Sequence, residues 1–208
     1  IRQSFRLLGR TESGSVAGQD GEATEVAEAM TREQRWLEDL DYLAQTLPAS
    51  HVQLFAHYEE AEFYADIERL KSGVGTLSDV DIYVALAKVF AKIGDTHTQL
   101  RPMLSWRTVP VQFMDFADGV YPVAWAAKYG SLAGLRLVAV GDTPFSEVQN
   151  QLSTIIPHDN QAQLQQSIPN LLSNYDLLLA MGFIADTGVI PYLLESADGT
   201  RRLVEMKV

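Results

Sequence analysis

The chain has 208 residues, 47% of them apolar, which is enough to fill one large or two small hydrophobic cores. Its 27 acidic and 16 basic residues give a net charge of -11, which opposes binding to nucleic acids and anionic membrane surfaces. The longest apolar runs, such as 120–127 and 177–184, are far shorter than the roughly 20 residues of a membrane-spanning helix. We therefore expect neither a nucleic-acid partner nor membrane insertion. Without cysteine, the chain has no disulfide, thiolate nucleophile or cysteine zinc site.

Residues 1–30 precede the first predicted helix. Alternating apolar and polar residues over 1–10 predict a short strand, and the Gly-, Ser- and acid-rich stretch 11–24 predicts a mobile loop. Because the sequence begins at Ile1 rather than Met, we expect a processed or trimmed piece of a longer protein.

Three amphipathic helices are predicted between residues 31 and 98. Thr31 and Gln34 have the spacing of a capping box, and Pro48 is expected to end the helix that follows. A second helix is predicted over about 59–71, and Ser78 caps a third, which ends at Gly94. The apolar positions that recur at the helical period are Trp36, Leu37, Leu40, Leu43, Ala44, Leu47, Phe63, Ile67, Leu70, Ile82, Leu86, Val89, Phe90 and Ile93.

After residue 98, short apolar runs broken by turn residues replace the helical period. The predicted elements are strands at 109–113, 120–125, 135–140, 189–195 and 203–208, and helices that start at Pro144 and after Asp159. Pro169 should kink or interrupt the second of these helices, and Asp198-Gly199 should turn a closing hairpin. The predicted fold class is α+β, with a small helical bundle over 31–98 and a mixed strand and helix domain over 99–208.

The run Gly94-Asp95-Thr96-His97-Thr98 directly follows the third predicted helix. Imidazole is the side chain whose unperturbed pKa lies near neutral pH, and Asp95, Thr96 and Thr98 are all able to hold such a ring by hydrogen bonds. His97 could equally tie the helix end to the following strand, without chemistry. An Asp just past a helix is commonly a turn former that binds its own backbone, which favours a structural role for Asp95.

This run resembles the Gly-Asp-x-His-Thr motif of the tricorn-type and C-terminal-processing serine peptidases, although Thr96 stands where relatives more often have Gly or Ser. Segments 36–43, 62–70 and 77–93 resemble the helical domain of bacterial members. The Gly-Leu-x-x-x-x-Val-Gly cadence within 132–141 resembles their PDZ-like domain. The resemblance extends over about residues 32–208.

In the tricorn-like branch, the resemblance implies that His97 is the general base for a serine nucleophile, with Thr96 and Asp95 as candidate orienting residues. The serine belongs to a later α/β catalytic domain. None of the thirteen serines here occupies a strand-to-helix elbow. The chain is thus expected to be the inactive, non-nucleophilic N-terminal portion of a serine endopeptidase.

The resemblance also implies the partners. These are a polypeptide substrate or C-terminal peptide, which the PDZ-like domain over 99–208 would guide, the missing catalytic domain, and a second copy of the chain in a homo-oligomer. No cofactor or metal is expected, because water hydrolyses the acyl-enzyme. The family favours a bacterial secreted or cell-envelope location.

The alternative is a non-catalytic interaction module of a degenerate peptidase homologue. Its PDZ-like domain would bind peptides or partner subunits, with an extended peptide captured by strand addition. The usual Gly-rich carboxylate loop is not evident before Val111 or Val120. This leaves a packing or gating role equally open.

Three other groups of residues are given structural interpretations. His51, His57 and His158 lack metal-ligand spacing and are expected to be solvated. An exposed acidic face is expected from Glu59, Glu60, Glu62, Asp66 and Glu68. Core packing rather than an aromatic platform is expected from Trp36, Phe55, Tyr58, Phe63 and Tyr64.

Overall fold

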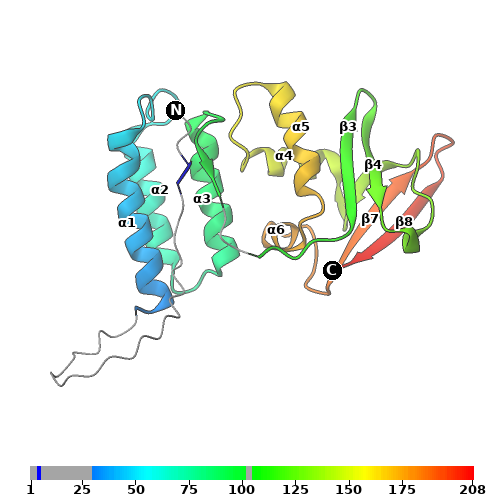
Figure 1. The fold of residues 1–208 in the computed structure, drawn as a ribbon, viewed down its shortest axis with the longest axis horizontal. Coiled ribbons are helices and arrows are strands. Elements are labelled where there is room, and N and C mark those ends of the chain that lie inside the picture. Colours follow the sequence, from blue (N-terminus) through cyan, green and yellow to red (C-terminus); the bar gives the residue numbers. More distant parts are fainter. Residues whose placement is uncertain (1–3, 6–29, 102–104) are drawn as a thin grey trace, which may run out of the picture.

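The computed structural model describes residues 4–5, 30–101 and 105–208. It is an α+β fold in which a helical domain precedes a domain of strands and helices (Figure 1). Most of residues 1–30, including the loop predicted over 11–24, lies outside the described residues. The strand predicted within 1–10 is present as β1 (Ser4–Phe5), which pairs in parallel with β2 (Gln99–Leu100).

The helical domain consists of α1 (Arg32–Ser50), α2 (Glu60–Gly73) and α3 (Asp79–Ile93). Both predicted caps are confirmed. The side chains of Thr31 and Ser78 each accept the backbone N–H three residues on, and the backbone N–H of each donates to the side chain of that same residue. Gly94 ends α3 with φ 71°, a left-handed conformation that favours glycine.

Two prolines stop their helices later than expected. Pro48 and Pro169 were each expected to end or break a helix, but α1 continues to Ser50 and α5 (Gln161–Leu171) continues to Leu171. Proline removes the hydrogen bond to the residue four positions before it and crowds the preceding turn, so it is tolerated best in the first turn of a helix. Pro48 and Pro169 lie instead in the last turn, and each helix ends two residues after its proline.

Apart from the β1-β2 pair, the described strands form a two-stranded sheet and a four-stranded sheet. β3 (Val111–Phe116) pairs with β4 (Gly119–Trp125), and the four-stranded sheet has the order β6-β5-β7-β8. The remaining strands are β5 (Arg136–Val140), β6 (Thr143–Pro144), β7 (Val189–Glu195) and β8 (Arg201–Lys207), and all pairs in both sheets are antiparallel. The hairpin turned at Asp198-Gly199 is confirmed.

Helices α4 (Phe145–Ser153), α5 and α6 (Tyr175–Ala180) lie between the helical domain and the sheets (Figure 1). Pro144 was expected at the first helical position, but it is the residue before α4 and belongs to β6. The sequence did not predict α6, and a short 3-10 turn spans Ala127–Tyr129.

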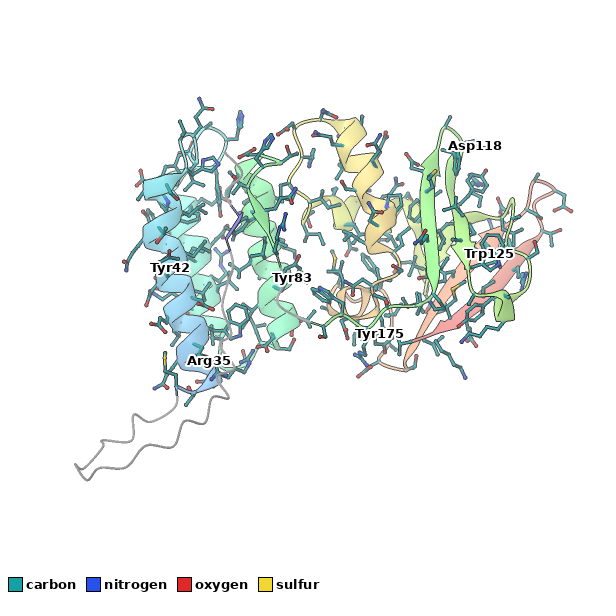
Figure 2. All side chains as sticks on the ribbon, in the orientation of Figure 1. Arg35, Tyr42, Tyr83, Asp118, Trp125 and Tyr175 are labelled. Atoms are coloured by element: carbon teal, nitrogen blue, oxygen red, sulfur yellow. The ribbon has the colours of Figure 1, made fainter. Side chains whose placement is uncertain are left out.

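Two hydrophobic cores meet at α3. The first joins α1, α2 and one face of α3, whereas the second includes Val84 and Ala87 from the other face of α3. Tyr83 lies on this second face, toward α6, and Tyr42 of α1 lies on the outer side of the molecule (Figure 2). Among the described residues, no helix has the length and apolar character that crossing a bilayer requires.

Candidate functional site

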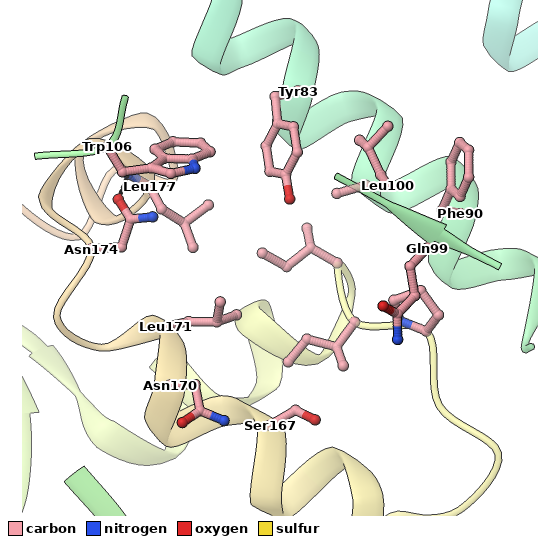
Figure 3. A pocket seen from close by; sticks show the side chains of 14 residues that line it. Tyr83, Phe90, Gln99, Leu100, Trp106, Ser167, Asn170, Leu171, Asn174 and Leu177 are labelled. Atoms are coloured by element: carbon pink, nitrogen blue, oxygen red, sulfur yellow. Dashed lines mark hydrogen bonds between the residues drawn. The ribbon is translucent and has the colours of Figure 1, made fainter. Parts of the chain in front are cut away.

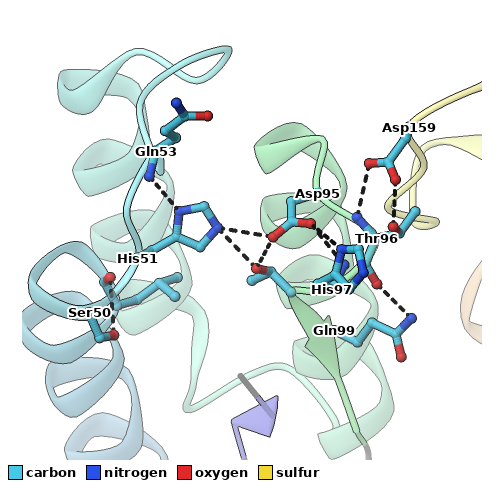
Figure 4. Close-up of polar contacts among 10 residues, drawn as sticks. Ser50, His51, Gln53, Asp95, Thr96, His97, Gln99 and Asp159 are labelled. Atoms are coloured by element: carbon cyan, nitrogen blue, oxygen red, sulfur yellow. Dashed lines mark hydrogen bonds and ion pairs between the residues drawn. The ribbon is translucent and has the colours of Figure 1, made fainter. Parts of the chain in front are cut away.

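The predicted motif forms a tight loop between α3 and β2 (Figure 4). The αL conformation of Gly94 turns the chain out of the helix, and Thr98 N–H donates to the carbonyl of Asp95 at 3.1 Å. This closed turn brings the side chains of Asp95, His97 and Thr98 to one small volume at the end of α3.

One carboxylate oxygen of Asp95 binds His97 twice. Oδ1 accepts the His97 backbone N–H at 2.9 Å and lies 3.2 Å from Nδ1 of the His97 ring. The sequence analysis treated turn formation and ring orientation as alternative roles for Asp95. The structure shows that Asp95 makes both contacts. A carboxylate accepts only, so the His97 nitrogen that faces it carries the proton, and Nε2 is left as the acceptor.

The other carboxylate oxygen of Asp95 is held from inside the helical domain. Oδ2 accepts the Thr98 hydroxyl at 2.7 Å, and Nε2 of His51 lies 3.3 Å away. Burial of Asp95 opposes its ionisation, but the hydrogen bonds from Thr98, His97 and His51 outweigh burial and lower the Asp95 pKa from 3.8 to about 2. Asp95 is therefore a carboxylate at neutral pH.

Thr96 was expected to orient the His97 ring, but its hydrogen-bond partner is Asp159. Its hydroxyl donates to Oδ2 of Asp159 at 2.6 Å, and its backbone N–H donates to Oδ1 at 3.3 Å. Within the described residues it makes no hydrogen bond to the His97 ring. Asp159 lies in the loop between α4 and α5, so this contact joins the motif to the second domain.

The His97 ring is open to solvent. Its side chain is 69% exposed, and Nε2 makes no hydrogen bond with any residue in the part of the chain that the structure describes. Beside the motif, a hollow of about 600 Å³ is lined by residues that include His51, His57, Asp95 and Asp159. Nε2 of His97 is therefore available as a hydrogen-bond acceptor to a group outside the described residues.

Two of the three other histidines are not solvated as expected. His57 is exposed, which confirms the expectation, but the His51 side chain is only 10% exposed. His158 is half-buried, with Nδ1 2.9 Å from the Ile156 carbonyl. Both rings are withdrawn from water by contacts with residues near the motif or in the loop after α4. No metal-ligating group of three His, Asp or Glu side chains occurs among the described residues.

The expected acidic face is wrong at one position. Asp66 is buried, and it accepts hydrogen bonds from Tyr58, Arg69 and Lys92. Burial opposes its ionisation, but these bonds outweigh burial and lower its pKa. The core packing expected of five aromatic residues is confirmed for Tyr58 and Phe63, which are buried and in edge-to-face contact. Trp36 and Phe55 are half-buried against this core, whereas Tyr64 is 40% exposed, contrary to the expectation.

A second cavity, of about 400 Å³, lies between α3 and the helices α5 and α6 (Figure 3). Tyr83 and Trp106 meet edge to face at its rim, with ring centroids 5.1 Å apart. Its lining is mostly apolar and carries no titratable cluster beside Tyr83. This cavity is therefore not the candidate catalytic site.

The α+β fold is similar to that of solved CPAF structures, and the comparison concerns the fold alone. Two solved structures of mature CPAF, a chlamydial serine protease, one of them complexed with lactacystin, superpose with a TM-score of 0.55 at 17% identity. The CPAF S499A mutant gives 0.58 at 18% identity. Each match covers 83% of this chain, and at such identity the likeness concerns the fold.

This chain spans about a third of the length of those solved chains, 34% for mature CPAF and 33% for the mutant. No family model and no curated protein sequence matches it. The assignment of the candidate site residues therefore rests on the geometry described above.

Proposed function

We propose that this chain is the non-nucleophilic, N-terminal portion of a tricorn-like serine endopeptidase, in which His97 is the general base. The observation that carries the proposal is the pairing of the exposed His97 ring with the Asp95 carboxylate, 3.2 Å from Nδ1. This pairing has the form of the carboxylate and imidazole of a serine-protease triad, in which the carboxylate holds the ring in the correct tautomer.

In the proposed reaction, Nε2 of His97 accepts the proton of a serine hydroxyl supplied by a following catalytic domain. The serine oxygen attacks the peptide carbonyl, and Nε2 then returns the proton to the leaving amine as the peptide bond breaks. Asp95 stays ionised throughout and stabilises the imidazolium. Water releases the acyl group in a second step through the same base.

We propose the predicted boundaries, with a helical domain over 31–98 and a PDZ-like domain over 99–208 that guides polypeptide to the cleft. The separate hydrophobic cores support this division, although two residues of α3, Val84 and Ala87, pack into the second core. α3 would therefore lie at the boundary between the two domains and contribute residues to both cores.

The direct test is His97→Ala in the full-length protein, measured as peptidase turnover on an unfolded polypeptide substrate. Removing a general base from a triad is expected to reduce turnover by about 10⁴-fold or more. His57→Ala is the matched control, since this histidine is also exposed and near the motif. Turnover retained by His97→Ala, with both variants folded, would remove the base assignment.

A second candidate function is a peptide-binding module without catalysis. The observation that favours it is β8, which within the described residues pairs with β7 alone; away from β7, the Lys207 backbone N–H donates to the Tyr129 hydroxyl, and no second strand is paired there. A hollow of about 780 Å³ lies beside it, lined by residues that include Gly141, Phe183 and Leu203. An extended peptide would add to such an edge through main-chain hydrogen bonds.

Calorimetric titration of this chain with a panel of C-terminal peptides tests this second candidate. Binding that is weakened by Leu203→Lys, at an exposed position of β8, supports it. No heat of binding with any peptide of the panel would count against it.

A further inference from the structure

His51 carries an imidazole that the proposed reaction does not use, and its side chain is only 10% exposed. It follows α1 as its C-cap, where its backbone N–H donates to the Leu47 carbonyl at 2.9 Å. Its ring extends from there to the motif at the end of α3, 44 residues later in the sequence, and touches Asp95 (Figure 4). A polar ring with so little exposure needs hydrogen-bond partners, and both of its nitrogens have them.

The partners of His51 fix the direction of each hydrogen bond. Gln53 donates its backbone N–H to Nδ1 at 3.2 Å, so Nδ1 is the acceptor. The ring proton is then on Nε2, which lies 3.0 Å from the Thr98 hydroxyl oxygen and 3.3 Å from Oδ2 of Asp95. Thr98 in turn donates its hydroxyl proton to the same Oδ2 at 2.7 Å. Donors therefore run in one direction, from His51 through Thr98 to Asp95.

This chain of donors occupies one side of the Asp95 carboxylate. Oδ2 receives bonds from inside the domain, while Oδ1 is left to the His97 backbone N–H and ring. Without the partners of Oδ2, only the two bonds of Oδ1 to His97 would hold the carboxylate, so its orientation would be less restricted. The orientation of the exposed His97 ring thus depends on groups that do not touch it.

We propose that His51 is a positioning residue for His97: through Thr98 and Asp95 it holds the His97 ring in the tautomer that leaves Nε2 free to accept a proton. This rests on the proposed function, in which that nitrogen is the base. His51 itself does not contact the reacting atoms. Its contribution is to keep the Asp95 carboxylate in the plane and direction that Nδ1 of His97 requires.

The test reads the tautomer directly, without peptidase activity. Long-range ¹H–¹⁵N spectra of the ¹⁵N-labelled 208-residue chain, recorded where the rings are neutral, distinguish the Nδ1–H from the Nε2–H form of each histidine. In the unaltered chain, we expect His97 to be mainly Nδ1–H and His51 to be mainly Nε2–H. A His51 ring protonated on Nδ1 would overturn the proposal before any variant is made.

Variants then test the dependence. His51→Leu and Thr98→Val should each lower the Nδ1–H to Nε2–H ratio of His97 by about fivefold, which corresponds to the loss of one ordinary hydrogen bond. His51→Gln, which keeps an N–H donor near Oδ2, should restore the ratio, and His57→Gln is the control without effect. An unchanged ratio in His51→Leu or in Thr98→Val, with a dispersed, folded spectrum, would overturn the proposal.

The two proposals fail in different measurements. If His97→Ala leaves turnover intact in the full-length protein, the base assignment falls while the tautomer dependence on His51 can still hold. If the tautomer ratio does not respond to His51, the positioning role falls while His97 can still be the base.

Discussion

The two hydrophobic cores differ in the polar groups that they bury. In the helical domain, Asp66 and Thr98 are 8% and 2% exposed. Around the second core, the described residues bury no charged, amide or Ser/Thr side chain, and the polar atoms there belong to tyrosines such as Tyr192. A buried polar group is costly unless it is hydrogen-bonded. In the helical domain, the buried Thr98 hydroxyl is bonded to Asp95 and so helps to fix the candidate catalytic loop.

The buried groups of the helical domain each tie separate elements together. Asp66 of α2 binds Tyr58, which precedes that helix, and Lys92 of α3. Thr98 lies between His51, at the end of α1, and Asp95, at the end of α3. Tyr192 instead donates its hydroxyl to the Leu172 carbonyl, which is a neutral bond inside one core. Both Asp66 and Thr98 therefore join parts of the helical domain that are separate in the sequence.

The largest expected effect is the difference in unfolding free energy between truncating a buried and an exposed phenylalanine. Phe90 is fully buried on α3, and Phe90→Ala should lower the free energy of unfolding by about 3–5 kcal/mol. Phe116→Ala is the matched control, because that ring on β3 is 46% exposed and should cost less than about 1 kcal/mol. Urea unfolding followed by circular dichroism measures both. Equal costs would show that the helical core is not packed as described.

An intermediate effect compares the buried polar groups of the two cores. Asp66→Ala leaves the Tyr58 hydroxyl without its acceptor and should cost about 2–3 kcal/mol. Tyr192→Phe removes one neutral hydrogen bond and should cost about 1 kcal/mol. The same urea titrations apply. A larger cost for Tyr192→Phe would break the contrast between the cores.

A smaller effect is the acid sensitivity of the motif. Since the folded-state pKa of Asp95 is lowered from 3.8 to about 2, its contribution is complete above about pH 4 and disappears as the pH falls toward 2. Partial exposure to solvent limits this loss to about 1–2 kcal/mol. Unfolding free energies of the unaltered chain and of Asp95→Asn should therefore converge between pH 4 and pH 2. Parallel curves would contradict the bonding described for Asp95.

Local signals in the sequence predicted much of the fold. Thr31, Ser78 and Gly94 mark helix ends through bonds to residues only three or four positions away, and the structure has all three. α6 was missed, although one signal for it exists, because the Asn174 side chain accepts from Leu177 N–H as a helix cap. That helix has only six residues, too few for a helical period to be visible.

The partners of the motif were not predictable in the same way. Asp95 and His97 are two residues apart, so their contact was among the expected alternatives. His51 and Asp159 reach the motif across 44 and 63 residues of sequence. Nothing in a single sequence records such distances, because they are set by how α1, α3 and the loop before α5 pack. His51 was accordingly expected in solvent, and Thr96 beside the ring.

The bond between Thr96 and Asp159 has a mechanical consequence. Thr96 immediately precedes His97, and Asp159 belongs to the loop that leads into α5. Two contacts therefore position His97. Asp95 holds its ring against the three helices, and the bond from Thr96 to Asp159 holds the adjacent main chain against the unit that contains the strands. Any sliding of one unit past the other has to break that threonine contact or drag the histidine along with it.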